Sequence, residues 1–125
     1  MIFKAKKSLG QNFLVDKNIL RLIANSTKIE KNDEILEIGP GTGNLTEFLV
    51  KKKPKKIYLI EKDENLVNLL KNKFSKNLNI INEDILKFSK NSFLNSKSII
   101  FGNLPYNISS QILVKFIINK NKFKF

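Results

Sequence analysis

Residues 34–43, EILEIGPGTG, decide how this chain builds its fold. A short run of isoleucine, leucine and glutamate stops at Gly39, which predicts a strand followed by a tight glycine turn. Apolar residues at helical spacing follow over 45–50, up to the lysine run 51–53. A strand, a turn and a helix in this succession are the repeating unit of an α/β protein.

The same unit recurs along the rest of the chain. Further strands are predicted over 57–60, 78–82 and 98–102, and helices over 16 to about 25, 63–74 and 109 to about 119. Asp16 and Asp63 are the expected N-caps of the first two of these helices. Because the strands are apolar on both faces and the connections contain helices, the order predicts a parallel sheet covered by helices.

The residue types that are missing exclude several kinds of chemistry. The 125 residues contain no cysteine, which rules out disulfides, thiolate metal sites and thiol nucleophiles. They contain no histidine, which removes histidine zinc sites, Ser-His-Asp triads and imidazole acid–base catalysis. The apolar runs are far shorter than a bilayer span, and residues 1–8 lack the apolar segment of a signal peptide. We therefore expect a cytoplasmic protein with neither a membrane nor a metal as partner.

The net charge points to a polyanionic partner. Lysine and arginine number 23 against 11 acidic residues, which gives a formal charge of +12, and Arg21 is the one arginine. All the acids lie between Asp16 and Asp84, so both ends of the chain are basic. The charge alone makes RNA, DNA and a membrane surface candidates, and a lysine-rich coding bias is an alternative source of the charge.

Each of four predicted strands ends in residues that can bind a ligand. The first ends in the glycine turn, the second at Glu61, the third at Asp84 and the fourth at Asn103. In parallel sheets ligands bind outside the carboxyl ends of the strands, so these residues are expected to form one site.

Glu61 and Asp84 have the positions of nucleoside-binding acids. Glu61 follows Gly39 by 22 residues, the separation at which a carboxylate meets ribose hydroxyls, and Asp84 could accept a hydrogen bond from an adenine amino group. The glycine spacing differs from that of a dinucleotide site, because Asn44 stands where the third glycine belongs. As alternatives, Glu61 could be a helix N-terminal acid or a partner of Lys62, and Asp84 could cap a turn.

The segment Asn103-Leu104-Pro105-Tyr106 is suited to an exocyclic amine. Such an amine is a poor nucleophile because its lone pair is conjugated with the ring. Hydrogen bonds to the Asn103 side-chain oxygen and to a backbone carbonyl would favour a pyramidal nitrogen. Pro105 stiffens the turn, and Tyr106 offers a ring on which a flipped base can stack. A Pro-Tyr turn that only closes a strand is the alternative interpretation.

Five segments in order resemble the N-terminal half of the ribosomal RNA small-subunit adenine dimethyltransferases. This family is similar to the erythromycin-resistance methylases and to mitochondrial transcription factor B. The matching segments are 8–14 (SLGQNFL), 37–46 (EIGPGTGNLT), 61–63 (EKD), 83–86 (EDIL) and 101–109 (FGNLPYNIS). They span nearly the whole chain.

The resemblance implies a Rossmann-like class I methyltransferase fold with S-adenosylmethionine as cofactor. It implies N6,N6-dimethylation of two adjacent adenosines near the 3′ end of small-subunit rRNA, with the immature small ribosomal subunit as partner. The residues that it places against the cofactor or the target adenine come from all five segments. The implied cofactor contacts are Asn12, Leu14, Gly39, Gly41, Glu61, Asp84 and Asn103, and the implied catalytic residues are Asn103, Leu104, Pro105 and Tyr106.

The family's catalytic domain continues with further strands, followed by a helical RNA-binding domain. Residues 1–125 are therefore expected to be the N-terminal part of the methyltransferase domain, ending after the fourth strand and its following helix. The edge of the fourth strand, residues 99–101, is then expected to be unpaired and apolar. Although the family is usually monomeric, we expect this chain alone to be unstable, to self-associate or to depend on a missing piece.

Three alternatives to the small-subunit enzyme stay open. One is a large-subunit methylase of the erythromycin-resistance type, although 39–43 and Leu104 favour the small-subunit branch. Another is a remnant that binds S-adenosylmethionine or RNA without turnover. The last is a small-molecule methyltransferase or nucleotide-binding domain, against which 11–14 and the basic ends count.

Overall fold

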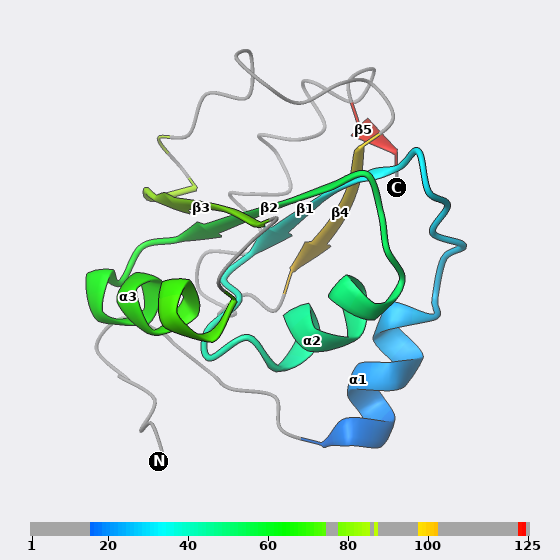
Figure 1. Ribbon diagram of the computed structural model, residues 1–125, viewed down its shortest axis with the longest axis horizontal. Coiled ribbons are helices and arrows are strands. Elements are labelled where there is room, and N and C mark those ends of the chain that lie inside the picture. Colours follow the sequence, from blue (N-terminus) through cyan, green and yellow to red (C-terminus); the bar gives the residue numbers. More distant parts are fainter. Residues whose placement is uncertain (1–15, 75–77, 86, 88–97, 103–122, 125) are drawn as a thin grey trace.

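The computed structural model describes residues 16–74, 78–85, 87, 98–102 and 123–124 (Figure 1). In chain order its elements are α1 (Lys17–Ala24), β1 (Glu34–Ile38), α2 (Asn44–Lys51), β2 (Lys56–Glu61), α3 (Glu64–Lys73), β3 (Leu78–Asn82), β4 (Ser98–Gly102) and β5 (Phe123–Lys124). The predicted strands and the first three predicted helices are all present, with ends that differ by one or two residues. The helix predicted over 109 to about 119 lies outside the described residues.

β1 lies at the centre of a parallel sheet. The strand order is β3-β2-β1-β4-β5, and each neighbouring pair is parallel. The chain therefore runs from β1 outward to β2 and β3, and then returns to the other side of β1 for β4. Because the strand order reverses here, the carboxyl ends of β1 and β4 are the topological switch point, where sheets of this kind bind ligands. The predicted parallel α/β sheet is confirmed.

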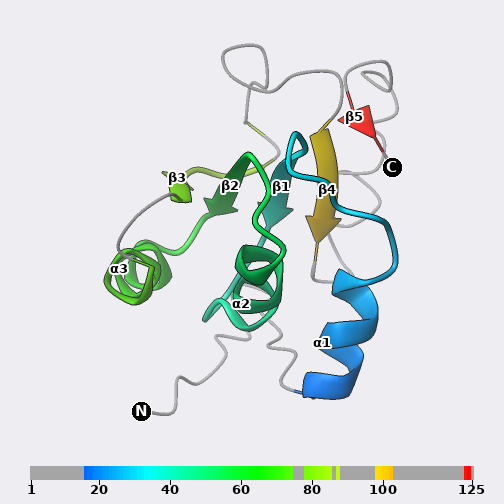
Figure 2. The same ribbon diagram turned by 45° about the vertical axis from the view of Figure 1, so that its right-hand side comes forward.

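α1, α2 and α3 lie on one face of the sheet, as two views of the molecule show (Figures 1 and 2). Their apolar side chains form a shared core with every second residue of the central strands. This core contains Leu20, Ala24, Leu45, Leu49 and Leu70 from the helices and Ile35, Ile57, Leu59, Ile99 and Phe101 from the strands. The alternate residues of β1 and β2 face the other side of the sheet and, apart from Lys56 at the start of β2, are also buried. β3 differs from the prediction, because as an edge strand it is only partly buried.

Two aspartates begin helices as predicted. The Asp16 carboxylate accepts hydrogen bonds from the backbone N–H groups of Asn18 and Ile19 at 2.9 and 3.3 Å. The Asp63 carboxylate accepts one from the N–H of Asn65 at 2.8 Å. Each satisfies donors that have no partner within the first turn of a helix, which fixes where α1 and α3 start.

α2 begins at a glycine that no other residue can replace without strain. Gly43 has φ of 86°, a left-handed conformation, and it packs directly against the end of α3. A Cβ atom at Gly43 would lie 2.7 Å from Phe74 Cε2 and 3.1 Å from Leu70 Cδ2. The glycine therefore sets how closely the turn before α2 approaches α3.

We expect Gly43→Ala to lower the free energy of unfolding by about 2 to 4 kcal/mol. The left-handed conformation costs an alanine roughly 1 to 2 kcal/mol, and overpacking against the Phe74 ring adds a similar amount. Chemical denaturation measures the change. In a Phe74→Leu background the penalty should shrink toward the backbone contribution, because the clash with the ring is gone. An equal penalty in both backgrounds would show that the contact with Phe74 is unimportant.

The far edge of the sheet corrects one expectation. We expected the chain to end without a strand beyond β4, leaving 99–101 unpaired. Instead β5 pairs with β4 in parallel, with Phe123 opposite Ser98 and Lys124 opposite Ile99. The added strand occupies backbone N–H and C=O groups at the beginning of β4 that would otherwise be open to another chain. The edge is thus partly covered, and Ile99 and Phe101 are buried. Self-association of the chain stays a prediction.

Candidate functional site

The carboxyl ends of β1, β2, β3 and β4 come together at one edge of the sheet, which we call the carboxyl edge. In the strand register Ile38 lies beside both Ile60 and Gly102, and Glu61 lies beside Asn82. The turn after β1, the acid that ends β2 and the segment after β3 are therefore neighbours. The structure brings together Gly39, Gly41, Glu61 and Asp84 from three of the four predicted strand ends.

The glycine turn is held by backbone hydrogen bonds on both sides. Gly39 N–H donates to the carbonyl of Ile60 at 2.9 Å, and Gly43 N–H donates to the carbonyl of Pro40 at 2.9 Å. Gly39 and Gly41 both have positive φ, 67° and 60°. The turn therefore keeps a fixed shape with no side chain at these positions, so that a ligand can approach the backbone closely.

Glu61 joins the second strand to the glycine turn. Its Oε1 accepts a hydrogen bond from Gly41 N–H at 3.2 Å, and its Oε2 accepts one from Asp63 N–H at 2.9 Å. The side-chain amide of Asn82 donates to the backbone carbonyls of Glu61 and Lys62 at 3.0 and 3.1 Å. These hydrogen bonds hold the Glu61 carboxylate in a fixed position at the carboxyl edge. Glu61 is only 5% exposed.

The bonding of Glu61 leaves room for a ligand. A carboxylate can accept about four hydrogen bonds; the amides of Gly41 and Asp63 occupy two of these positions, and the Lys62 amide makes a smaller contribution. Burial raises the pKa of Glu61, and the amide donors of Asp63 and Gly41 counteract part of that rise. Additional donors, such as a pair of hydroxyl groups, would favour the charged form further. Geometry and chemistry both fit a ribose that donates to this carboxylate.

Asp84 lies at the end of β3 with a half-buried side chain. Its Oδ2 lies 3.6 Å from Lys62 Nζ, so the Lys62 ammonium pairs with Asp84, while the Lys62 backbone amide is a donor to Glu61. Its backbone carbonyl accepts from Lys87 N–H at 2.9 Å, which closes a turn. Asp84 therefore has a local structural role as well as a position at the carboxyl edge.

Glu37 is a buried acid at this edge that the sequence analysis did not single out as a site residue. It is 1% exposed, and its Oε1 accepts a hydrogen bond from Thr46 Oγ1 at 2.6 Å. Burial raises its pKa to about 7, the Thr46 hydrogen bond counteracts this, and the charge of Glu61 adds to it. An acid within an otherwise apolar strand was the sequence signal for this residue.

The raised pKa of Glu37 predicts a pH dependence of stability. Between its ordinary value of 4.5 and about 7 the folded protein holds a proton that the unfolded chain has lost. The stabilising contribution is therefore complete below the lower value and disappears as the pH rises through the upper one. Glu37→Gln, which does not titrate, should gain up to about 3 kcal/mol relative to the parent between about pH 5 and about pH 8.

Chemical denaturation across this pH range measures the effect. The exposed Glu83→Gln variant is the matched control, and its stability should stay parallel to that of the parent protein. If Glu37→Gln also stays parallel, Glu37 is not protonated in the folded state and the assigned titration is wrong.

Lys73 ties α3 to the glycine turn and was also missed. Its Nζ donates to the carbonyl of Thr42 at 2.9 Å and lies 2.7 Å from Glu47 Oε1. The same ammonium stands over the Phe74 ring, 5.6 Å from its centroid. These contacts join residues about thirty positions apart in the chain, and no local pattern indicates them.

The other predicted site residues lie outside the described part of the chain. These are Asn12, Leu14, Asn103, Leu104, Pro105 and Tyr106. The residue before Asn103, Gly102, pairs with Ile38 and so stands beside the start of the glycine turn.

Two negative findings apply to the described residues. No group of three or more acidic, histidine or cysteine side chains there is arranged to hold a metal ion. None of the helices there is long and apolar enough to cross a membrane.

Comparison with known proteins identifies the family to which this chain is similar. Residues 2–124 match the model of the family described as ribosomal RNA adenine dimethylase. A relative from Pelagibacter ubique, ribosomal RNA small subunit methyltransferase A, is 57% identical over 119 residues, which are 95% of this chain and 45% of the relative. The chain spans about half the length of the curated relatives it matches.

Solved structures give the same result. A dimethyladenosine transferase from Plasmodium falciparum is 32% identical and superposes with a TM-score of 0.78, over 90% of this chain and 41% of that one. The 23S rRNA methyltransferase ErmE is 26% identical with a TM-score of 0.77, over 90% and 45%. The fold is thus that of the Rossmann-like methyltransferases, and the chain belongs to the ribosomal RNA adenine dimethylase family.

Proposed function

We propose that this chain is the cofactor-binding part of an enzyme that dimethylates two adjacent adenosines near the 3′ end of small-subunit rRNA. S-adenosylmethionine would be the methyl donor. The observation that carries the proposal is the hydrogen bond from Gly41 N–H to Glu61 Oε1, which joins the glycine turn to a buried acid at the carboxyl edge. The similarity to small-subunit methyltransferases supports the substrate.

Some of the site residues would contact the cofactor, and others would contact the target adenosine. Gly39 and Gly41 would line the methionine part of the cofactor, Glu61 would accept from its ribose hydroxyls and Asp84 from its adenine amino group. From segments outside the described residues, Asn12 and Leu14 would contribute further cofactor contacts. The catalytic segment would be Asn103-Leu104-Pro105-Tyr106, with Asn103 between the cofactor and the target amine and Tyr106 under the target base.

Methyl transfer requires the protein mainly to position the cofactor and the target amine. When bound, S-adenosylmethionine supplies an electrophilic methyl group for an in-line displacement. The protein would orient the adenine amine, hold it with Asn103 and exclude water. The amine can lose its proton after the transfer, so a chain without histidine or cysteine has what the reaction needs.

The domain organisation belongs to the same proposal. Residues 1–125 would form the N-terminal part of the methyltransferase domain. The helical RNA-binding domain of the family would be a separate part of the complete enzyme. The coverage of the relatives, less than half of their length, supports this division. A cytoplasmic location would follow from a ribosomal substrate.

Transfer of labelled methyl groups by the complete enzyme tests the substrate. We expect label in small ribosomal subunits that lack the modification, in the form of dimethyladenosine. The similarity to ErmE makes large-subunit RNA the second substrate to try. Label in large-subunit RNA would favour the erythromycin-resistance type, and label in free nucleosides would contradict an rRNA substrate. Binding of S-adenosylmethionine without any transfer would favour a remnant without turnover.

A further inference from the structure

The charges of the described residues are divided between the two ends of the parallel strands. The carboxyl edge carries the acids of the candidate site. Where β1 and β2 begin, which we call the amino edge, the exposed side chains are mostly lysines. Six of them form what we call the amino-edge lysine patch: Lys28, Lys31, Lys52, Lys53, Lys55 and Lys56.

Three contacts bring the two lysine-bearing segments of the patch side by side. The Lys52 ammonium donates to the side-chain oxygen of Asn25 at the end of α1. Lys55 N–H donates to the carbonyl of Asp33 at 2.8 Å. Lys56 lies opposite Glu34 in the register of β1 and β2. The loop before β1 and the loop before β2 therefore form one surface, although they are more than twenty residues apart in the sequence.

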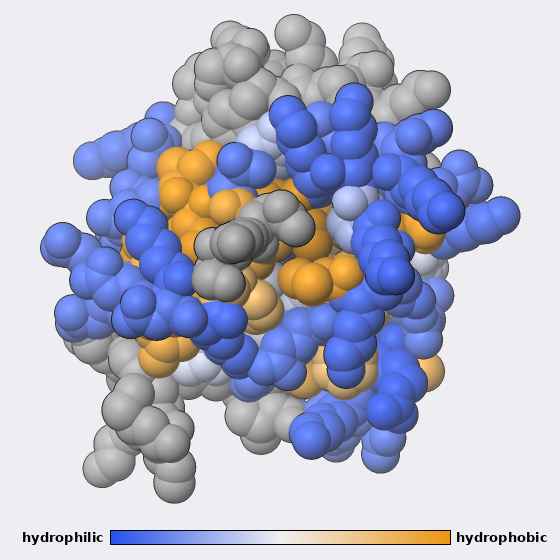
Figure 3. All heavy atoms as spheres, in the orientation of Figure 1, coloured by the Kyte–Doolittle hydropathy of each residue, from blue (hydrophilic) through white to orange (hydrophobic). Residues whose placement is uncertain are grey.

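Three acids lie near the patch, Glu30, Asp33 and Glu34, and its six lysines outnumber them two to one. Glu30 lies 3.6 Å from Lys28, but their side chains are 62% and 87% exposed, and ion pairs this exposed are weak. Asp33 and Glu34 are each 5% exposed. The Asp33 carboxylate is engaged by Glu30 N–H at 2.8 Å. The exposed charges of the patch are therefore mostly those of lysines. In the space-filling view the upper right of the molecule, where β1 and β2 begin in Figure 1, is mostly hydrophilic (Figure 3).

The composition of the patch selects one kind of polyanion. Lysine ammonium groups are point charges that suit phosphate groups. The large apolar side chains that are exposed in the described parts of the chain are Ile19, Leu22 and Val50, and none of them belongs to the two patch loops. The patch therefore offers neither an aromatic ring for an unstacked base nor an apolar side chain for a bilayer. We propose that the amino-edge lysine patch binds the phosphate backbone of structured RNA without reading its sequence.

This contact is separate from the one at the candidate site. β1 and β2 are five and six residues long, so at roughly 3.3 Å per residue the two edges lie about 15 to 20 Å apart. A phosphate at the patch is therefore not one of the two phosphates that flank the adenosine at the carboxyl edge. The choice of RNA over a DNA duplex, and its identification as ribosomal, rest on the proposed function, whereas the affinity of the patch for a phosphate backbone does not.

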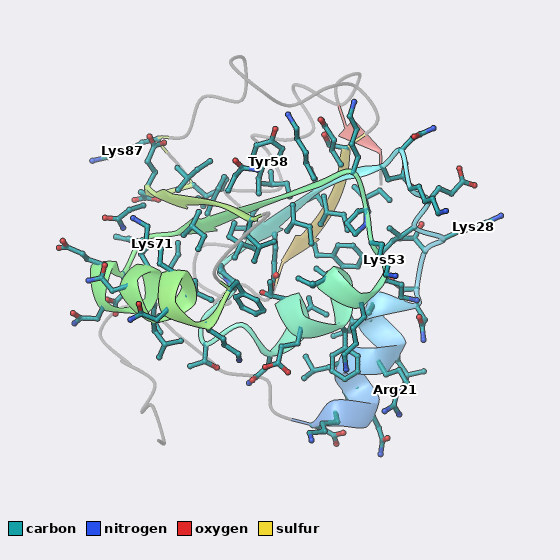
Figure 4. All side chains as sticks on the ribbon, viewed as in Figure 1. Arg21, Lys28, Lys53, Tyr58, Lys71 and Lys87 are labelled. Atoms are coloured by element: carbon teal, nitrogen blue, oxygen red, sulfur yellow. The ribbon has the colours of Figure 1, made fainter. Side chains whose placement is uncertain are left out.

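Two double variants with the same loss of charge test the proposal. Lys53→Gln with Lys55→Gln removes charge from the patch, and Lys71→Gln with Lys87→Gln removes it from exposed lysines on the other side of the molecule (Figure 4). The probe is a fluorescently labelled RNA duplex of unrelated sequence, titrated at several salt concentrations. The patch variant should bind about tenfold more weakly at roughly 0.1 M salt, and its salt slope should fall by about two. The control should change affinity by less than about twofold.

Several results would overturn the proposal. No loss in the patch variant would remove the site, and equal losses in both variants would show attraction by net charge alone. Tighter binding of the parent protein to anionic lipid vesicles than to the duplex would identify a membrane surface instead. Affinity for S-adenosylmethionine, measured by calorimetry, should be the same in all variants. If the parent protein does not bind that cofactor, the proposed function fails while the duplex titrations still decide the patch.

Discussion

Replacing Glu61 with alanine is expected to weaken the binding of S-adenosylmethionine about a hundredfold. The Glu61 carboxylate keeps acceptor positions free after it has bound the amides of Gly41 and Asp63, and both ribose hydroxyls would donate to it. Losing two hydrogen bonds to a charged, buried group costs roughly 3 kcal/mol or more, which is about two orders of magnitude in Kd. Isothermal titration calorimetry measures the change.

The controls must separate the ribose contact from the structural role of Glu61. Glu64→Ala removes the same charge from an exposed position in the first turn of α3, and cofactor affinity should change little. Chemical denaturation of Glu61→Ala measures how much the free energy of unfolding falls when the amides of Gly41 and Asp63 lose their acceptor. The loss of cofactor affinity should exceed any loss of RNA affinity, and the reverse order would contradict the ribose assignment.

The pKa of Glu61 gives a second readout of the same assignment. Burial raises this pKa in the ligand-free protein, and hydroxyl donors to the carboxylate would lower it in the complex. Binding should therefore release protons, so affinity should rise with pH through the range in which the Glu61 carboxylate of the ligand-free protein loses its proton. This dependence should be absent in Glu61→Gln, and a dependence that survives there would place the titrating group elsewhere.

Features governed by neighbours in the sequence could be predicted. Asp16 and Asp63 precede apolar runs at helical spacing, and each caps the helix that follows. Glu61 ends a buried strand, and because neighbouring parallel strands end at one edge, its place beside the glycine turn followed from the strand order. The resemblance to rRNA dimethyltransferases came from the same short segments, and the family match confirms it.

Features that depend on how distant elements approach each other could not be predicted. The contact of Lys73 with Thr42 exists because Gly43 lets the turn approach the end of α3, and no single segment encodes that distance. The pairing of β5 with β4 involves only two residues, too few for a strand pattern. The degree of burial of Glu37 depends on Thr46 and the packing of α2 against β1, so its raised pKa is a property of the folded chain.

Replacing Asn103 with alanine is expected to slow methyl transfer about a hundredfold or more while changing cofactor affinity by only a few fold. Asn103 directly follows Gly102, whose pairing with Ile38 brings the chain to the start of the glycine turn. A side-chain oxygen in this position would accept from the adenine amine and favour its pyramidal, nucleophilic form. Removing one such preorganised hydrogen bond from a reacting centre costs about two to three orders of magnitude in rate.

The distinguishing measurement is the rate at saturating cofactor and RNA, set beside the two binding constants. If Asn103 acts on the reacting amine, the rate falls while binding of RNA and of S-adenosylmethionine is largely kept. Asn68→Ala, an asparagine replacement at an exposed position of α3, should leave all three quantities unchanged. An Asn103→Ala enzyme with an unaltered rate would remove Asn103 from catalysis. An equal loss in rate and cofactor affinity would make it a binding residue, since the substitution would then act on the cofactor and not on the amine.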